Sequence, residues 1–335
     1  MKIFVFEYIS GGGMNDQVLP ESLIREGDMM LQALTKDLTA QFGVELYITR
    51  DYRLSEHFFL QFQNIHLIDV AKDSDIKSIF TALCHQCDAV WPVAPESDDI
   101  LAELCDIVVA SKTRLLNSAA AAVKITGNKL TTYSFLENKR IPVILTKTLS
   151  GYLWQPSDTC VIKSVDGVGC ENSFLINNKA EYENITASII NSNDYIIQPY
   201  VKGKSISLSC LFNNGRAWLI CCNEQKIKVE KQQFLLSACI VNIAMEQKQI
   251  LCEIIDAIAD AIPGLWGYVG VDLIMASTGP IILEINPRLT TSYAGINAAL
   301  GINIAESVLR LNKREPCFKI TRNQTEILTL ANSAI

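Results

Sequence analysis

The sequence predicts an α/β protein with α+β subdomains, in which a parallel sheet precedes a section of antiparallel strands. Two observations support this fold class. Near the start of the chain, short apolar runs alternate with amphipathic segments, as do the strands and helices of a doubly wound sheet. Later, strand-like runs follow one another through turn residues such as Asn213-Asn214-Gly215, which is typical of antiparallel hairpins.

Composition places the chain among globular proteins. Its 335 residues are 49% hydrophobic and 19% charged, which is enough for two or three domains with cores of their own. The formal net charge of −7 argues against a nucleic-acid-binding protein, which needs a basic face. The apolar runs are shorter than the ~20 residues that cross a bilayer. The 11 cysteines are irregularly spaced. We therefore expect reduced thiols in a cytoplasmic protein with no nucleic-acid or membrane partner.

The N-terminal section is expected to form the parallel sheet. Its predicted strands are residues 2–8, 44–49, 66–70 and 89–93, and its predicted helices lie near 21–42 and 74–84. Ligands of such sheets bind beyond the carboxyl ends of the strands. The glycines at 11–13 follow the first strand and Pro95-Glu96 follows the fourth. We therefore expect these two segments to face one crevice.

The rest of the chain is expected to add a small subdomain and a larger one. Asn128 is a favourable N-cap for a helix over 129–137, which ends before Ile141-Pro142. Further strands are predicted at 159–164, 174–176, 195–199, 206–212 and 217–222, and further helices near 179–190, 246–261 and 303–311, with a final strand after the last helix.

A predicted hairpin over residues 267–288 is the most informative segment. One of its faces carries oxygen-bearing side chains that suit a hard cation, namely Asp272, Glu284 and Asn286. The opposite face carries Leu283 and Ile285, which we expect in a core. Arg288 follows at once, and such a set suits Mg²⁺ shared with phosphate oxygens. The alternative is a hairpin whose outer face merely carries solvated polar residues.

Four motifs in one order resemble the ATP-grasp superfamily. They are Asn128-Lys129 at a helix start, Lys163 followed by Asp166-Gly167-Val168-Gly169, the segment from Gln198 to Gly203, and Gly270-Val271-Asp272 with Glu284-Ile-Asn-Pro-Arg288. The section before them resembles the pre-ATP-grasp domain of that superfamily. The opening segment from Phe4 to Gly13 resembles the tyramine–glutamate ligase group, which is associated with methanofuran-type one-carbon cofactors.

This resemblance implies three parts and two bound cofactors. Residues 1–110 would form the pre-ATP-grasp domain, 111–198 the small ATP-grasp subdomain with its central helix, and 199–335 the C-terminal subdomain with the metal hairpin. The cofactors would be ATP and one or two Mg²⁺ ions, with Mn²⁺ as an alternative. Glu284 would bridge the two ions.

The resemblance also implies an ATP site. Two lysines would neutralise the phosphates, and a glycine loop would cover them through backbone N–H groups. The adenine would pair with the backbone of the 198–201 segment, and Ser205 or an acidic residue elsewhere would hold the ribose. The implied ATP-binding residues are Lys129, Lys163, Asp166, Gly167, Gly169, Gln198, Pro199, Tyr200, Val201 and Ser205. Lys163 and Arg288 are the implied catalytic residues.

The implied reaction joins a carboxylate to an amine. Glutamate, through its γ-carboxyl, would attack the γ-phosphoryl group, and an aromatic amine such as tyramine or tyrosine would then displace phosphate. The implied substrate-binding residues are Glu7, Ser10, Gly11, Gly12, Gly13, Glu96 and Arg288. For the glycines, an ordinary turn after a strand is the alternative. Glu7 and Glu96 stay open as bases for the amine, and a homodimer, common among similar enzymes, stays open as the assembly.

Three other functions compete with this one. An ATP-grasp amide ligase for other amino-acid or peptide substrates would use the same mechanism. A dinucleotide-binding oxidoreductase fits poorly, because the glycines are contiguous and do not form G-x-G-x-x-G. A non-catalytic ATP-binding protein would have no reason to retain the full set of charged residues.

Overall fold

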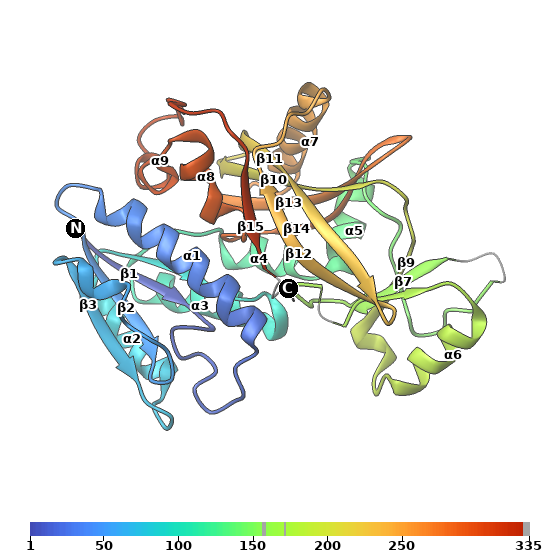
Figure 1. The fold of residues 1–335 in the computed structure, drawn as a ribbon, viewed down its shortest axis with the longest axis horizontal. Helices are drawn as coiled ribbons and strands as arrows, with labels where there is room; N and C mark the ends of the chain where they lie inside the picture. Colours follow the sequence, from blue (N-terminus) through green and yellow to red (C-terminus); the bar gives the residue numbers. More distant parts are fainter. Residues whose placement is uncertain (156–158, 171, 331–335) are drawn as a thin grey trace.

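A computed structural model describes residues 1–155, 159–170 and 172–330. The fold of these residues is built on two β-sheets (Figure 1). The N-terminal sheet is parallel, with strand order β3-β2-β1-β4-β5. The second sheet contains the path β14-β13-β10-β11-β12-β8-β7-β9-β6, and β15 pairs with β12. The predicted fold class, a doubly wound domain followed by antiparallel subdomains, is confirmed.

The N-terminal section follows the predicted order of strands and helices. Its strands are β1 (Lys2–Glu7), β2 (Glu45–Asp51), β3 (Ile65–Val70), β4 (Ala89–Val93) and β5 (Arg114–Leu115). Its helices are α1 (Glu21–Thr39), α2 (Ile76–Gln86) and α3 (Ile100–Ala110), and short 3-10 turns lie at η1 (Phe59–Gln61) and η2 (Ser97–Asp99). The predictions did not include α3, although its mostly apolar residues pack against β4 and β5.

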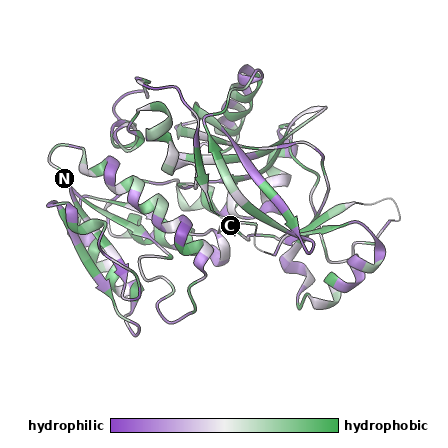
Figure 2. Cartoon of the chain, in the orientation of Figure 1, coloured by the Kyte–Doolittle hydropathy of each residue, from purple (hydrophilic) through white to green (hydrophobic). Residues whose placement is uncertain are grey.

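The side chains of β1 point alternately to the two faces of its sheet, which explains why helices cover both faces. Ile3 and Val5 belong to the same buried cluster as the apolar residues of α1. Phe4 and Phe6 belong to a second cluster with the apolar residues of α2 and α3. Neighbouring side chains of a strand point to opposite faces, so a fully apolar strand needs a partner layer on each. In Figure 2 the strands of this sheet are largely hydrophobic, whereas α1 alternates hydrophilic and hydrophobic turns.

Most of the small subdomain lies at the opposite end of the molecule from the N-terminal sheet, although its first helix packs against α3 (Figure 1). Its elements are α4 (Ala120–Gly127), α5 (Lys129–Asn138), β6 (Lys147–Thr148), β7 (Cys160–Ser164), β8 (Phe174–Ile176), α6 (Lys179–Ser188), η3 (Ser192–Asp194) and β9 (Tyr195–Pro199). The predicted N-cap is confirmed, because the Asn128 side chain accepts a hydrogen bond from the Thr131 N–H at 2.9 Å.

The third section supplies the long strands and the closing helices. Its elements are β10 (Lys204–Asn213), β11 (Arg216–Glu230), β12 (Gln233–Val241), α7 (Lys248–Ala261), β13 (Gly267–Ala276), β14 (Gly279–Asn286), α8 (Tyr293–Leu300), α9 (Ile304–Arg310) and β15 (Glu326–Thr329). The predictions lacked β12 and α8 and ended β11 too early. The predicted domain boundaries after residues 110 and 198 stay predictions.

The hairpin β13–β14 departs from simple alternation at one point. Asp272 pairs with Glu284, but Leu273 pairs with Ile282, so Leu283 is the extra residue of a β-bulge. The prediction that Leu283 faces a core was therefore wrong. It lines a cavity together with Glu284, while Ile285 is buried in the core as predicted.

Contacts from α1 to α8 hold the N-terminal section against the third one. Asp37 accepts hydrogen bonds from the Tyr293 hydroxyl at 2.8 Å and from the Asn297 amide at 3.1 Å. Burial raises the pKa of Asp37 to about 6, although these hydrogen bonds oppose that rise. The interface between these two sections therefore contains a carboxyl group with a pKa of about 6.

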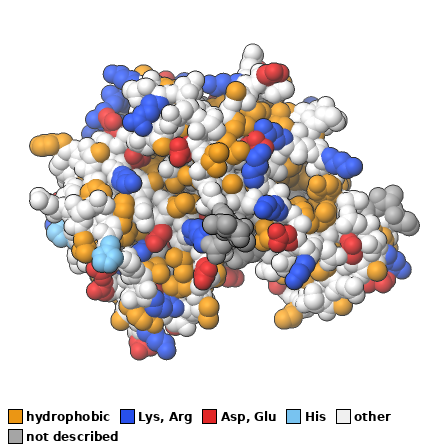
Figure 3. Space-filling model, viewed as in Figure 1, with side chains coloured by type: hydrophobic (Ala, Val, Ile, Leu, Met, Phe, Trp, Pro, Cys, Tyr) orange, Lys and Arg blue, Asp and Glu red, His pale blue; other side chains and the backbone are white. Residues whose placement is uncertain are grey.

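Three further features bear on the predicted class. All 11 cysteines are free thiols. None of the helices in the described part of the chain is both long and apolar enough to cross a bilayer. Figure 3 shows acidic and basic side chains interspersed on the face that it presents.

Candidate active site

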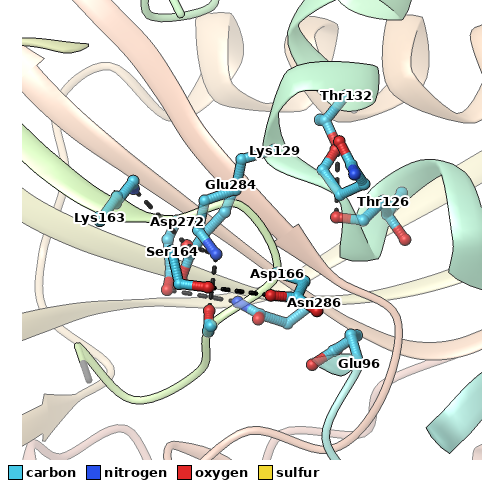
Figure 4. Close-up of polar contacts among 12 residues, drawn as sticks. Glu96, Thr126, Lys129, Thr132, Lys163, Ser164, Asp166, Asp272, Glu284 and Asn286 are labelled. Carbon is cyan, nitrogen blue, oxygen red and sulfur yellow. Dashed lines mark hydrogen bonds and ion pairs between the residues drawn. The ribbon is translucent and has the colours of Figure 1, made fainter. Parts of the chain in front are cut away.

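Charged side chains of both signs meet in a cavity of about 280 Å³ between the small subdomain and the strands β13 and β14 (Figure 4). We call this the phosphate cavity. Its lining includes most of the predicted ATP and metal residues, namely Lys129, Lys163, Gly167, Gln198, Pro199, Tyr200, Val201, Ser205, Asp272 and Glu284. Residues from five separate segments of the chain thus converge on one site.

Two lysines flank Glu284. Lys129 is the first residue of α5 and Lys163 lies on β7, and their Nζ atoms lie 3.6 Å and 3.9 Å from Glu284 Oε2. Burial would raise the pKa of Glu284, but the two ammonium groups and Arg288 lower it. Burial lowers the pKa of Lys163, and the Glu284 carboxylate opposes this. This cluster therefore combines a charged carboxylate with ammonium groups, whose charge an anionic ligand could also neutralise.

Asp272 on β13 presents a buried oxygen that lacks a partner among the described residues. Its Oδ2 accepts hydrogen bonds from Gln225 at 3.2 Å and from Asn286 at 3.3 Å, whereas Oδ1 has none. Burial, followed by the nearby Glu284 charge, raises the pKa of Asp272 to about 6. An unpaired buried carboxylate oxygen is costly unless a cation approaches it.

These oxygen donors fit Mg²⁺. Asp272 Oδ1 and the Glu284 carboxylate are hard ligands, and since the Asn286 nitrogen donates to Asp272, its amide oxygen is the atom left for a cation. Within the described residues, no cluster of three or more His, Cys, Asp or Glu side chains that could hold a metal was found. A site with two carboxylates and one amide relies on phosphate oxygens to complete an octahedral shell.

The residues of the predicted phosphate loop line two different cavities. Gly167 lines the phosphate cavity, and its carbonyl accepts a hydrogen bond from Lys129 Nζ at 2.6 Å. Asp166 lies outside the lining. Its carboxylate accepts from the Ser164 hydroxyl at 2.9 Å and from the Asp98 N–H at 3.1 Å. It therefore anchors the loop to the N-terminal section. Gly169 lines a second cavity.

The predicted adenine segment begins with the last two residues of β9 and continues past its end. The Gln198 side chain donates to the Thr146 hydroxyl at 2.9 Å, and is therefore used within the protein. Lys204 forms an ion pair with Glu224 at 2.8 Å, next to Ser205 in the lining. Apolar side chains complete the walls on both sides, namely Val161, Ile227, Val229, Phe234, Ile274 and Leu283. A flat base suits the space between such walls.

Arg288 is held by Glu96 across the boundary of the two sections. Arg288 Nε lies 3.0 Å from Glu96 Oε1 and Nη2 lies 3.0 Å from Oε2, which is a two-point contact between planar groups. Both side chains are largely buried. Burial would lower the pKa of Arg288, but the Glu96 charge raises it above its usual value. Glu96 therefore positions the guanidinium, and its carboxylate is already engaged.

Arg288 also lines a second cavity of about 390 Å³, between α1, the end of β4 and the loop at Gly169. We call this the acceptor crevice. Of the predicted substrate-binding residues, Glu7 and Arg288 belong to its lining. Pro95 does as well, as predicted for the segment after the fourth strand.

The three glycines do not belong to that lining. The Gly11 N–H donates to the Glu7 carbonyl at 2.7 Å, and the Gly13 N–H donates to the Tyr8 carbonyl at 2.8 Å. Gly12 has a φ of +94° and packs against Val70, where a Cβ would clash. The segment is a tight turn, and the Ser10 N–H donates to the Glu7 carboxylate at 2.6 Å within it. The segment is therefore a glycine turn after a strand, and its role in binding substrate stays a prediction.

Two family models match most of the chain. A pre ATP-grasp 3 domain matches residues 44–123, and an ATP-grasp domain matches residues 126–292. This chain belongs to the ATP-grasp superfamily.

Relatives of this ATP-grasp protein agree in length and fold. A tyramine–L-glutamate ligase of Methanocaldococcus jannaschii is 28% identical over 321 residues, covering 95% of this chain and 92% of the relative. A crystal structure of a putative ATP-grasp superfamily protein from Archaeoglobus fulgidus aligns with a TM-score of 0.73 at 19% identity, covering 98% of this chain and 92% of the other. An L-amino acid ligase from Bacillus licheniformis aligns with a TM-score of 0.65 at 13% identity, covering 96% and 75%.

Some site residues of this ATP-grasp chain escaped the sequence predictions. Gln225 holds Asp272, and Glu26 on α1 lines the acceptor crevice and accepts a hydrogen bond from Thr291 Oγ1 at 2.6 Å. Gln225 could have been suspected from its polar position on a strand-like run. Glu26 lies in an amphipathic helix and carries no local signal.

Proposed function

We propose that this ATP-dependent carboxylate–amine ligase joins the γ-carboxyl group of glutamate to an aromatic amine such as tyramine or tyrosine, with release of ADP and phosphate. One observation carries the proposal. Glu284 is flanked by Lys129 and Lys163 and lies beside Asp272, whose Oδ1 accepts no hydrogen bond among the described residues. Arg288, which follows the same hairpin, lines the acceptor crevice. The similarity to a tyramine–L-glutamate ligase over nearly the full length supports the choice of substrates.

The side chains of the phosphate cavity would prepare ATP for attack. Lys129 and Lys163 would exchange their contacts with Glu284 for contacts with phosphate oxygens, which restores charge balance in a buried site. Asp272, Glu284 and Asn286 would hold Mg²⁺, one ion or two, with Mn²⁺ as an alternative. When bound, the metal would neutralise phosphate charge and polarise the phosphoryl group.

Arg288 would orient the transferred group. A glutamate carboxylate oxygen attacks the γ-phosphorus, the bond to the β–γ bridging oxygen breaks, and an acyl phosphate and ADP result. The amine then attacks the acyl carbon and phosphate leaves. Because Glu96 fixes the guanidinium by hydrogen bonds to two of its nitrogens, Arg288 can stabilise the phosphoryl oxygens without reorganising.

The direct test measures ADP release with Mg-ATP, L-glutamate and tyramine, with mass spectrometry of the product. Each substrate is omitted in turn, and tyrosine replaces tyramine in a parallel series. ADP together with a condensed product that requires every component supports the proposal. Glutamate-dependent ADP with no condensed product contradicts the choice of amine, and absence of ADP in every combination contradicts both substrates.

Three wider expectations belong to this proposal. A glutamyl amide of an aromatic amine would suit a methanofuran-type one-carbon cofactor, as the sequence resemblance implies. A cytoplasmic location and a homodimeric assembly also stay predictions. Product analysis in cells lacking the protein and light scattering of the purified chain would test the first and the last.

A further inference from the structure

We propose that Glu26 on α1 binds the ammonium group of the acceptor amine and takes its proton. This inference rests on the proposed function and extends it, because it names the group that prepares the nucleophile. An amine at neutral pH is protonated and cannot attack an acyl phosphate until it loses a proton. A ligase of this kind therefore gains from a carboxylate in the crevice where the amine arrives.

The acceptor crevice suits a cation with an apolar body. Its charged lining residues are three carboxylates, Glu7, Glu26 and Asp98, and one guanidinium, Arg288. Arg288 is already paired with Glu96, which lies outside this lining, so its charge is balanced within the protein. The apolar part of the lining includes Tyr8, Ile9, Met14, Leu23, Met30 and Ile100. Such a combination attracts an ammonium group and shelters an aromatic ring.

Two of the three carboxylates are placed for other tasks. The Glu7 carboxylate accepts hydrogen bonds from the Ile9 and Ser10 N–H groups, at 3.3 Å and 2.6 Å, and so holds the glycine turn. Its side chain packs against Gly27, where a Cβ would lie only 2.6 Å from Glu7 Oε2. Asp98 is exposed, at the rim of the crevice. Neither is suited to receive a proton beside the reacting carbonyl.

Glu26 has the position that the reaction needs. It is partly buried, and it shares one face of α1 with three other lining residues, Leu23, Gly27 and Met30, at helical spacing. Its Oε2 accepts a hydrogen bond from Thr291 Oγ1 at 2.6 Å, three positions after Arg288. Glu26 and Arg288 also line the same crevice, so the two groups face one space. Thr291 thus fixes the carboxylate next to the phosphoryl-orienting arginine.

The proton balance of the step is complete. The ammonium group gives one proton to the Glu26 carboxylate, and the nitrogen lone pair forms the C–N bond. The C–O bond to phosphate breaks, and a second proton leaves the nitrogen with the phosphate. One proton stays on the amide, and Glu26 returns its proton to solvent. The carboxylates in the lining also predict a preference for an amine such as tyramine over tyrosine, whose own carboxylate they would repel.

The test compares Glu26→Gln with wild type in two reactions of the full-length protein. In the first, hydroxylamine traps the acyl phosphate as a hydroxamate, and because it is largely unprotonated at neutral pH it needs no base. In the second, tyramine is the acceptor. We expect Glu26→Gln to retain hydroxamate formation within about 2-fold and to lose about 10²-fold in kcat/KM for tyramine. Glu21→Gln, an exposed change on the same helix, is the matched control and should affect neither reaction.

Thr291→Val gives a second variant, which keeps the Glu26 carboxylate but removes the hydrogen bond that Thr291 donates to it. It should lower kcat/KM for tyramine about 10-fold, with hydroxamate formation again retained. Equal tyramine turnover by Glu26→Gln and wild type would overturn the inference and leave the proposed function intact. Loss of hydroxamate formation in Glu26→Gln would place the residue at the glutamate instead, and would also overturn it. If wild type itself forms no glutamate-dependent hydroxamate, the proposed function fails, and this inference fails with it.

Discussion

Replacing Glu284 with glutamine removes the carboxylate that lies between Lys129 and Lys163 and keeps the size of the side chain. The two Nζ–Oε2 distances are 3.6 Å and 3.9 Å. At an effective dielectric constant of about 20, each contact corresponds to roughly 4 kcal/mol of Coulomb attraction. Glu284 is 27% exposed, its burial costs hydration and the Asp272 carboxylate repels it, so we expect a net loss of only about 3 kcal/mol in the free energy of unfolding of the ligand-free protein.

Urea unfolding of the ligand-free and Mg-ATP-bound proteins measures this effect. Besides the loss of stability, we expect that Mg²⁺ no longer increases the stabilisation given by ATP, and that glutamate-dependent ADP formation is abolished. Glu183→Gln is the matched control, because Glu183 pairs with Lys179 on the surface of α6 with both side chains exposed. That variant should change the stability by less than about 0.5 kcal/mol. A Glu284→Gln protein that unfolds like wild type and turns over normally would refute the assignment of charges and metal.

Three other changes test separate parts of the structure. Glu96→Gln should lower kcat about 10²-fold while the KM for ATP stays unchanged, because Arg288 loses the carboxylate that holds it at two points. Steady-state kinetics would check this, and an unchanged kcat would count against a role for the Glu96–Arg288 pair. Leu283→Ala should weaken ATP binding about 10-fold in calorimetry, because a wall of the phosphate cavity is lost; wild-type affinity would argue that the base lies elsewhere. Asp37→Asn should flatten the pH dependence of stability. The raised pKa of Asp37 means that the folded state binds the proton more tightly than the unfolded state does. Wild-type stability should therefore fall by up to about 3 kcal/mol as the pH rises from about 4 to 6. Parallel curves for the two proteins, from chemical unfolding at several pH values, would show that Asp37 does not titrate in that window.

The sequence by itself determined the features that depend on neighbours along the chain. An apolar run predicted β1, and alternation predicted the hairpin β13–β14, because both patterns are local to each strand. Asn128 predicted the start of α5, since a cap bonds to N–H groups a few residues away. The spacing of Glu284 and Asn286 placed the predicted cation ligands on one hairpin, and the structure keeps Asn286 in contact with Asp272.

The tertiary structure alone decided the contacts between distant segments. Glu96 and Arg288 are 192 positions apart, and Glu26 and Thr291 are 265 apart. No periodic pattern specifies which residues meet across such separations, because those contacts arise only when α1, β4 and the loop after β14 pack together. Leu283 shows the same limit within a hairpin: a single bulge reverses the side to which its side chain points, and bulges depend on the partner strand. Hence local patterns, together with the family resemblance, predicted the residues of the proposed phosphate-binding half, and packing between the two sections created the half where an acceptor would bind.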